Sequence, residues 1–186
     1  IGIDLNPEAK KLEKDGFKII IGDQSKAIFW KNFYKKNGKI DVLIDDGGHT
    51  NMQQITTFVE SLDFINDGGI IIIEDTHTSF MKKKGFNNPS KYSMVNFSSS
   101  IIENLHRRNP NIKKKMNTFS KKIYSIEYFD SIISFKVDKD KCKKTKNLEN
   151  NSRLRNYFSD YRFKKDTSQN SKMSIFQNKF FSKRSI

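Results

Sequence analysis

The stretch DVLIDDGGHT, at residues 41–50, places two adjacent carboxylates, two glycines and a histidine directly after an apolar segment. Asp45, Asp46 and His49 are therefore neighbours in the chain, at a point where a strand is expected to end. A second acidic pair, Glu74 and Asp75, follows another apolar run. Carboxylates accept hydrogen bonds, and a histidine changes its charge near neutral pH, so these groups are suited to handling a polar ligand. These five side chains are the first candidates for a functional site.

The elements that must position these side chains are apolar strands that alternate with helices. Strands are predicted at residues 1–5, 17–23, 39–46 and 68–75, and helices at 6–16, 24–38 and 51–64. Thr50 and Gln53 have the spacing of a capping box at the start of the third helix. A helix at 97–107 and an antiparallel hairpin at 122–137 follow. Continuous apolar strands between helices predict an α/β fold whose mostly parallel sheet is covered on both sides, with the hairpin at its end.

Acidic residues close each of the predicted parallel strands. In strand order they are Asp4, Asp23, the pair Asp45 and Asp46, and the pair Glu74 and Asp75. Ligands of such sheets bind at the carboxyl ends of the strands, and Asp4 is placed to accept hydrogen bonds from the hydroxyls of a ribose. Taken alone, each acid is better explained as a helix cap or a solvated loop residue. Together they define one acidic rim.

The segments IGIDLNP, GDQS, DVLIDDGGH and GGIIIIEDTHTSF resemble successive motifs of class I S-adenosylmethionine-dependent methyltransferases. The resemblance is to the metal-dependent sugar O-methyltransferases of the mycinamicin type, and it covers residues 1–137. Its most specific part is DDGGH together with EDTHTS. It implies a Rossmann-like sheet, S-adenosyl-L-methionine and Mg²⁺ as cofactors, and methylation of a hydroxyl on a sugar, a glycoside or a similar small molecule.

The resemblance also implies roles for the acidic rim. Asp46, Glu74 and Asp75 would bind magnesium, which prefers hard oxygen ligands, and His49 would be the general base. Coordination lowers the pKa of a bound hydroxyl, so a histidine that titrates near neutrality could accept its proton. The alternative for His49 is a loop histidine that caps the following helix. His77 either faces the substrate or lines the loop.

On the cofactor side, the resemblance implies that Asp4 binds the ribose and that Asp23 and Gln24 lie near the adenine. Asp45 would be an acid of the cofactor side or a support behind the metal. The glycine-rich turn after the family's first strand is missing, because the chain begins with Ile1 at what would be the second strand. We therefore expect a fragment that lacks the first strand, which lies between the second and the fourth strands of that fold.

The net charge of +14 belongs mainly to the end of the chain. Residues 138–186 hold 14 Lys and Arg against 5 Asp and Glu, and they show no sustained apolar period. We expect a methyltransferase domain at 1–137 and a basic, weakly ordered tail at 138–186. The aromatic residues of the tail either pack on the domain or stack on nucleic-acid bases between the basic side chains. Cys142 is the only cysteine, which fits a reducing compartment such as the cytoplasm.

No run of about 18 apolar residues is present, so no membrane span is expected. Two other functions stay open: a nucleic-acid methyltransferase, which the basic tail favours, and a non-catalytic Rossmann-like binding module, which the missing glycine turn favours. The loop at 76–96 is long enough for a substrate lid, and Phe80, Phe86 and Tyr92 either stack on the substrate or anchor the loop. The sequence leaves the oligomeric state open, a homo-oligomer included.

Overall fold

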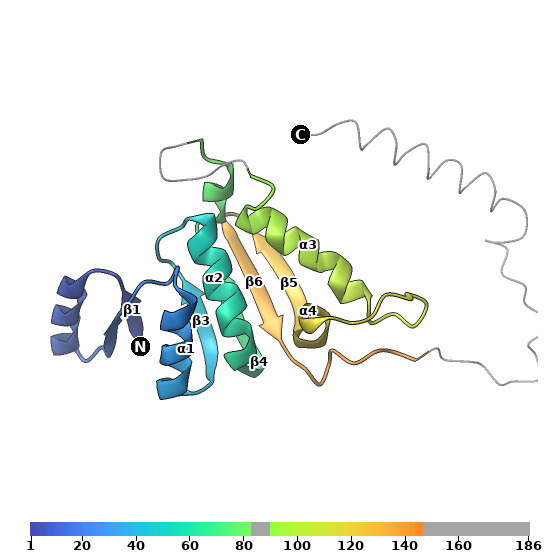
Figure 1. Ribbon diagram of the computed structural model, residues 1–186, viewed down its shortest axis with the longest axis horizontal. Coiled ribbons are helices and arrows are strands. Elements are labelled where there is room, and N and C mark those ends of the chain that lie inside the picture. The colour runs from blue at the N-terminus through green and yellow to red at the C-terminus, as the bar shows by residue number, and fades with distance from the viewer. Residues whose placement is uncertain (83–89, 147–186) are drawn as a thin grey trace, which may run out of the picture. The chain divides into compact units, whose positions relative to one another are not determined.

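The larger sheet contains β3 (Ile40–Asp45), β4 (Ile65–Ile73), β5 (Ile123–Phe129) and β6 (Ile132–Val137), in the spatial order β3-β4-β6-β5 (Figure 1). This computed structural model describes residues 1–82 and 90–146. β3 and β4 are parallel, whereas β6 pairs antiparallel with both β4 and β5. The hairpin predicted at 122–137 is thereby confirmed, and β4 begins three residues earlier than predicted.

A second, two-stranded parallel sheet is formed by β1 (Gly2–Asp4) and β2 (Ile19–Ile21). They are connected by η1 (Pro7–Asp15), a 3-10 helix where the sequence predicted a helix at 6–16. The Asn6 side chain accepts a hydrogen bond from Glu8 at its start, and Gly16 ends it with a φ of 88°. That left-handed backbone carries little steric cost in glycine, which explains why this residue ends the helix.

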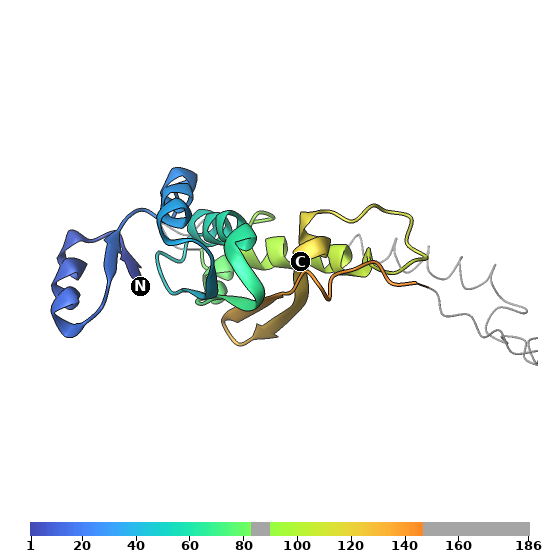
Figure 2. The ribbon, with the colours of Figure 1, turned by 90° about the horizontal axis from the view of Figure 1, so that it is seen from below.

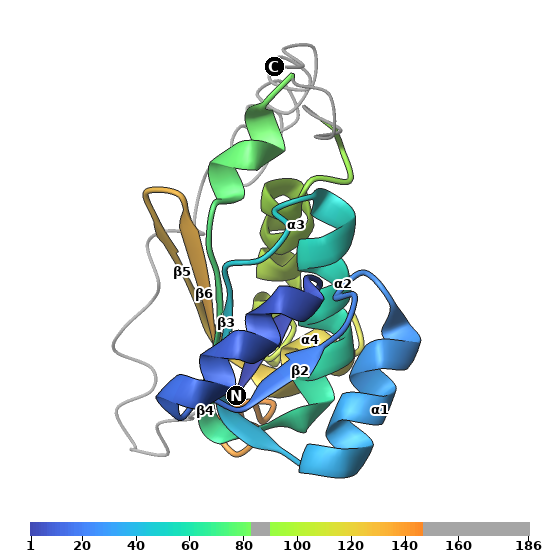
Figure 3. The same ribbon diagram turned by 90° about the vertical axis from the view of Figure 1, so that its left-hand side faces the viewer.

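Helices α1 (Ala27–Asn37), α2 (Asn51–Ser61) and α3 (Met94–His106) lie on one side of the larger sheet (Figures 2 and 3). Shorter elements complete the described chain: η2 (Leu62–Phe64), η3 (Thr76–Phe80) and α4 (Thr118–Lys122). The capping box predicted at Thr50 and Gln53 is present at the start of α2. This cap fixes where the loop after β3 turns into the helix, and the loop is the one that carries His49.

The core lies between these helices and the covered face of the sheet. Phe58 of α2 packs against Phe135 of β6 with ring centroids 4.3 Å apart and the ring planes tilted by 47°, and both side chains are fully buried. Ile71 and Ile73 of β4 are buried beside them. Removing a buried phenylalanine of this kind typically costs about 3–5 kcal/mol of stability. The packing of α2 on β4 and β6 therefore stabilises the part of the sheet whose strands lead to the acidic residues.

The second face of β3 is open. The alternation of the strand turns Leu43 and Asp45 toward the helices and Val42 and Ile44 away from them, and each of the latter is 56% exposed. For β3, and within the described residues, the prediction of a sheet covered on both sides is therefore wrong. β3 is also an edge strand, as is β1, and no strand of the described residues lies between them.

Residues 138–146 continue from β6. Asp138 and Cys142 are buried, and the backbone N–H of Thr145 donates to the carbonyl of Arg108 at 3.0 Å. The rest of the tail, including its aromatic residues from Tyr157 onward, lies outside the described residues, so the domain boundary after residue 137 stays a prediction. No helix in the described ranges is both long and apolar enough to span a bilayer.

Candidate functional site

The carboxyl ends of β3 and β4 lie side by side, because Asp45 pairs with Ile73 in the parallel register. The backbone N–H of Glu74 donates to the carbonyl oxygen of Asp45 at 3.0 Å, which extends the pairing one residue further. The residues that follow the two strands therefore emerge at one edge of the sheet. This register, which the sequence does not encode locally, is what brings DDGGH and EDTHTS together.

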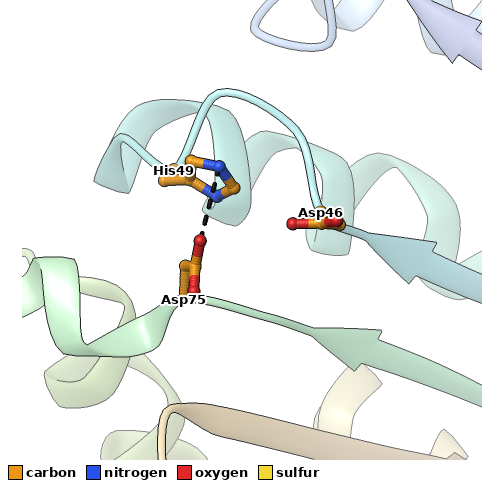
Figure 4. A group of neighbouring side chains, drawn as sticks. All are labelled: Asp46, His49 and Asp75. Atoms are coloured by element: carbon orange, nitrogen blue, oxygen red, sulfur yellow. Dashed lines mark ion pairs between the residues drawn. The ribbon is translucent and has the colours of Figure 1, made fainter.

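Asp46, His49 and Asp75 form a cluster at this edge (Figure 4). One ligand atom from each of the three lies within 4.8 Å of the others. Nε2 of His49 is 3.5 Å from Oδ2 of Asp75, a contact that becomes an ion pair when the histidine is protonated. Nδ1 of His49 is buried and has no hydrogen-bond partner within the described residues. Nε2 is therefore the nitrogen that faces the carboxylates.

Glu74, the third metal ligand that the resemblance implies, is not a member of this three-residue group. Both backbone polar groups of Glu74 are hydrogen-bonded: its N–H donates to the Asp45 carbonyl, and its carbonyl accepts from the Gln54 side chain at 2.8 Å. Gln54 is fully buried on α2, so this contact fixes the path of the chain immediately before Asp75. The structure thus brings together two of the three predicted carboxylates and the predicted base.

His77 lies on the other side of Asp75. Its Nδ1 is 2.5 Å from Oγ of Ser131, at the tip of the β5–β6 hairpin, and 3.8 Å from Oδ1 of Asp75. The Thr76 backbone N–H also donates to the Ser131 carbonyl at 2.9 Å. His49 and His77 therefore flank the Asp75 carboxylate, one near each oxygen. The hairpin tip supports the site from a segment more than 50 residues away, which no sequence pattern predicted.

Beside the cluster of Asp46, His49 and Asp75, Asp45 and Gln24 form a partly buried polar network. The Gln24 side chain donates to Oδ1 of Asp45 at 2.8 Å and to the Thr57 hydroxyl at 3.1 Å, and it accepts from the Gly48 N–H at 2.9 Å. Trp30 donates from its indole to the Gln24 carbonyl at 2.9 Å. No sequence pattern indicated a role for Thr57 or Trp30, because both belong to helices whose polar contacts depend on the packing.

The network borders a groove of about 470 Å³ between β1 and β3. Its lining includes Ile3, Val42 and Ile44, together with Gln24 and Asp45. Oδ2 of Asp45 is buried and has no hydrogen-bond partner within the described part of the chain. The groove therefore combines apolar walls with a few polar groups, which is typical of sites for small molecules and cofactors.

The other two acids predicted on the cofactor side, Asp4 and Asp23, are not in the lining of this groove. The Asp4 carboxylate is exposed at the end of β1 and accepts a hydrogen bond from the Asn6 N–H at 2.7 Å. Oδ1 of Asp23 accepts from the backbone and the hydroxyl of Ser25. These hydrogen bonds from Ser25 hold the pKa of Asp23 below its usual value.

Burial has the opposite effect on Asp45, whose pKa it raises above the usual value despite the hydrogen bonds from Gln24 and from the Gly47 N–H. The folded state therefore binds the Asp45 proton more tightly than the unfolded chain does, so ionisation weakens the fold as pH rises above about 4. Asp45→Asn keeps an oxygen for the hydrogen bonds that Oδ1 accepts from Gln24 and from the Gly47 N–H, and it cannot ionise. We expect its free energy of unfolding, measured in EDTA, to increase relative to wild type between pH 4 and 7. A constant difference would contradict this sign.

Of the predicted lid aromatics, Phe80 and Tyr92 have exposed side chains, 64% and 70% respectively, so neither anchors the loop in the core. Phe86 falls at a position outside the described residues. A lysine, Lys91, lies over the Tyr92 ring with its Nζ 4.9 Å from the centroid. Their contact with a substrate stays a prediction.

No protein-family model matches the sequence. The chain is 26% identical over 106 residues to 8-demethyl-8-alpha-L-rhamnosyl tetracenomycin-C 2'-O-methyltransferase of Streptomyces olivaceus. It is 35% identical over 63 residues to mycinamicin VI 2''-O-methyltransferase of Micromonospora griseorubida. These matches cover 56% and 34% of the chain, but only 28% and 16% of the two relatives. The predicted resemblance to sugar O-methyltransferases is confirmed at this level, over about a quarter or less of each relative.

Among solved structures, the chain is similar to the MycE methyltransferase of the mycinamycin pathway in complex with Mg, SAH and mycinamycin VI. The TM-score is 0.67 at 17% identity, over 82% of this chain and 39% of that one. The chain has a class I methyltransferase fold. A second MycE structure, with Mg and SAH, gives a TM-score of 0.63 at 20% identity over 74% of this chain and 36% of that one. At these identities the likeness establishes the methyltransferase fold alone.

Proposed function

We propose that this chain forms part of an O-methyltransferase that uses S-adenosyl-L-methionine and Mg²⁺ to methylate a hydroxyl of a sugar, a glycoside or a similar small molecule. The observation that carries the proposal is the cluster of Asp46, His49 and Asp75 at the ends of two parallel strands. The cluster adjoins the groove between β1 and β3, since Asp46 lies in the lining of that groove. The curated relatives, which are named as O-methyltransferases of a rhamnosyl tetracenomycin and of mycinamicin VI, support the same chemistry.

The donor set fits magnesium. Asp46 is exposed and Asp75 is partly exposed, so their carboxylates can hold a hard cation while leaving positions for water or substrate oxygens. When bound, magnesium lowers the pKa of a hydroxyl that coordinates it. Glu74 follows the same strand as Asp75 and stays our predicted third ligand.

His49 would then accept the proton of the acceptor hydroxyl at Nε2. That nitrogen faces the carboxylates, while Nδ1 is buried and can carry the hydrogen of the neutral ring. Asp75 at 3.5 Å would stabilise the imidazolium that forms. A base at this position commonly contributes about 100- to 10,000-fold to the rate.

The cofactor would bind in the groove, because the groove adjoins the cluster of Asp46, His49 and Asp75. S-adenosyl-L-methionine would supply a methyl group on a positively charged sulfur. Gln24 and Asp45 would provide the polar contacts, because both line the groove and Oδ2 of Asp45 is a buried acceptor that the described residues leave without a donor. Asp4, at the end of β1, stays our predicted ribose ligand, and Asp23 is proposed for the adenine side.

The experiment is transfer of a labelled methyl group from S-adenosyl-L-methionine to a panel of glycosides, with RNA in parallel, in Mg²⁺ or in EDTA. It is run on the chain with a strand and a glycine-rich turn joined before Ile1, as the resemblance implies. We expect methylated glycosides in Mg²⁺ and a large loss of product in EDTA. Product that is insensitive to EDTA would contradict the metal role. Labelled RNA in place of glycosides would favour a nucleic-acid methyltransferase, and binding of cofactor without transfer to either would favour a binding module.

A further inference from the structure

Two residues of the candidate site have a left-handed backbone. The φ angles are 55° at His49 and 52° at Asp75, and apart from these only Ser131 shares this feature among the described non-glycine residues. Such conformations carry a steric cost in residues with a Cβ atom, and they persist where the surrounding structure holds them in place. The two side chains that face each other across the site therefore depend on local contacts that hold their backbones.

One buried hydroxyl contacts both backbones. Oγ1 of Thr78 lies 2.8 Å from the carbonyl oxygen of His49 and 2.8 Å from the carbonyl oxygen of Asp75. The Thr78 residue is 3% exposed, so water does not replace these contacts. A threonine has a single O–H donor, which is here shared between two acceptors that come from different loops. The backbone N–H of Thr78 adds a third contact, to Asp75 at 3.0 Å.

We infer that Thr78 is a positioning residue of this site, whose hydroxyl holds the loop of His49 against the end of β4. This deepens the proposed function and rests on it, because the distance held is the one between the proposed base and a proposed metal ligand. Without the hydroxyl, the His49 carbonyl loses the hydrogen bond that joins its loop to η3, whereas Asp75 keeps the bond from the Thr78 N–H. The His49 loop is therefore the part that should loosen.

The test compares Thr78→Val, which keeps the shape and removes the hydroxyl, with Thr78→Ser, which keeps the hydroxyl. Thr76→Val is the matched control. It carries the same substitution on the same 3-10 helix at a buried position, and the Thr76 hydroxyl makes no hydrogen bond within the described residues. The first measurement is amide hydrogen exchange of peptides that cover residues 46–51, in EDTA, so that it does not depend on a bound metal.

We expect exchange of this segment to be about 3- to 10-fold faster in Thr78→Val than in wild type, as the loss of one buried hydrogen bond implies. Thr78→Ser and Thr76→Val should stay near wild type. Peptides of β4 and β6 should not change, which separates a local opening from a general loss of stability. Equal exchange of residues 46–51 in both valine variants would overturn the positioning role, whatever the metal does.

The second measurement is Mg²⁺ affinity by titration calorimetry on the same four proteins. Thr78→Val should bind Mg²⁺ about 3- to 10-fold more weakly, because the loop that loosens also carries the proposed ligand Asp46. Thr78→Ser should restore the affinity. If wild type binds Mg²⁺ and Thr78→Val binds it as tightly, Thr78 does not set the geometry of the site. If wild type itself binds no Mg²⁺, the proposed metal site fails, and the exchange measurement still decides whether Thr78 holds the loop.

Discussion

Replacing His49 with alanine is expected to lower turnover about 100- to 10,000-fold while S-adenosyl-L-methionine binding stays near wild type. The histidine belongs to the loop after β3, and its Nε2 lies 3.5 Å from Oδ2 of Asp75. His49 is not among the residues that line the groove proposed for the cofactor. Its loss should therefore remove the proton acceptor without removing a contact to the cofactor. Turnover and cofactor affinity are measured on the chain with the strand and glycine-rich turn joined before Ile1.

Mg²⁺ affinity of the same variant distinguishes two roles of His49. As a general base it contributes nothing to binding of the cation, so the affinity should not fall. As a metal ligand, a role that its place in the three-residue cluster would also allow, its loss should weaken Mg²⁺ binding together with turnover. His106→Ala is the control, because His106 is an exposed histidine at the end of α3. Wild-type turnover in His49→Ala would exclude both roles.

The parts of the fold that could be predicted from the sequence are those that depend on residues close together in the chain. The capping box of Thr50 and Gln53, the glycine at the end of η1 and the alternation of the β5–β6 hairpin each depend on residues a few positions apart. The acidic ends of the strands belong to the same class, because an apolar run followed by a carboxylate is visible without any knowledge of the partners. These signals were sufficient to place acidic residues at the ends of strands, whereas the pairing of β3 with β4 is what brings two of those ends together.

What the sequence could not predict depends on contacts between distant segments. Thr78 and Ser131 support the site through hydrogen bonds to residues 29 and 54 positions away. Which residues form the cluster also depends on contacts that the sequence does not show. Glu74 and Asp75 are adjacent in the chain, but Asp75, whose backbone is left-handed, is the one that lies in the cluster with His49. The open face of β3 also escaped prediction, since Val42 and Ile44 are apolar and yet exposed.

Asp46→Asn and Asp75→Asn are each expected to weaken Mg²⁺ binding by at least about 10-fold. Groups that only support a metal ligand commonly contribute 10- to 100-fold to metal affinity, so a carboxylate that binds the cation directly should contribute no less. Asparagine keeps the shape of the side chain and one oxygen while removing the negative charge that a divalent cation requires. Turnover should then depend on a much higher Mg²⁺ concentration, because His49 is still present to accept the proton.

The measurement is a Mg²⁺ titration followed by calorimetry and, in the chain with the strand and turn joined, by turnover. Asp41→Asn is the matched control, because Asp41 lies near the other end of β3, where its carboxylate accepts a hydrogen bond from Asn66. Glu74→Gln tests the third predicted ligand, and a loss as large as that of Asp75→Asn would place Glu74 on the cation as well. Because Asp46 and Asp75 follow different strands, a shared metal site requires that both variants lose affinity. Loss in only one of them would mean that the carboxylates approach each other without sharing a metal ion.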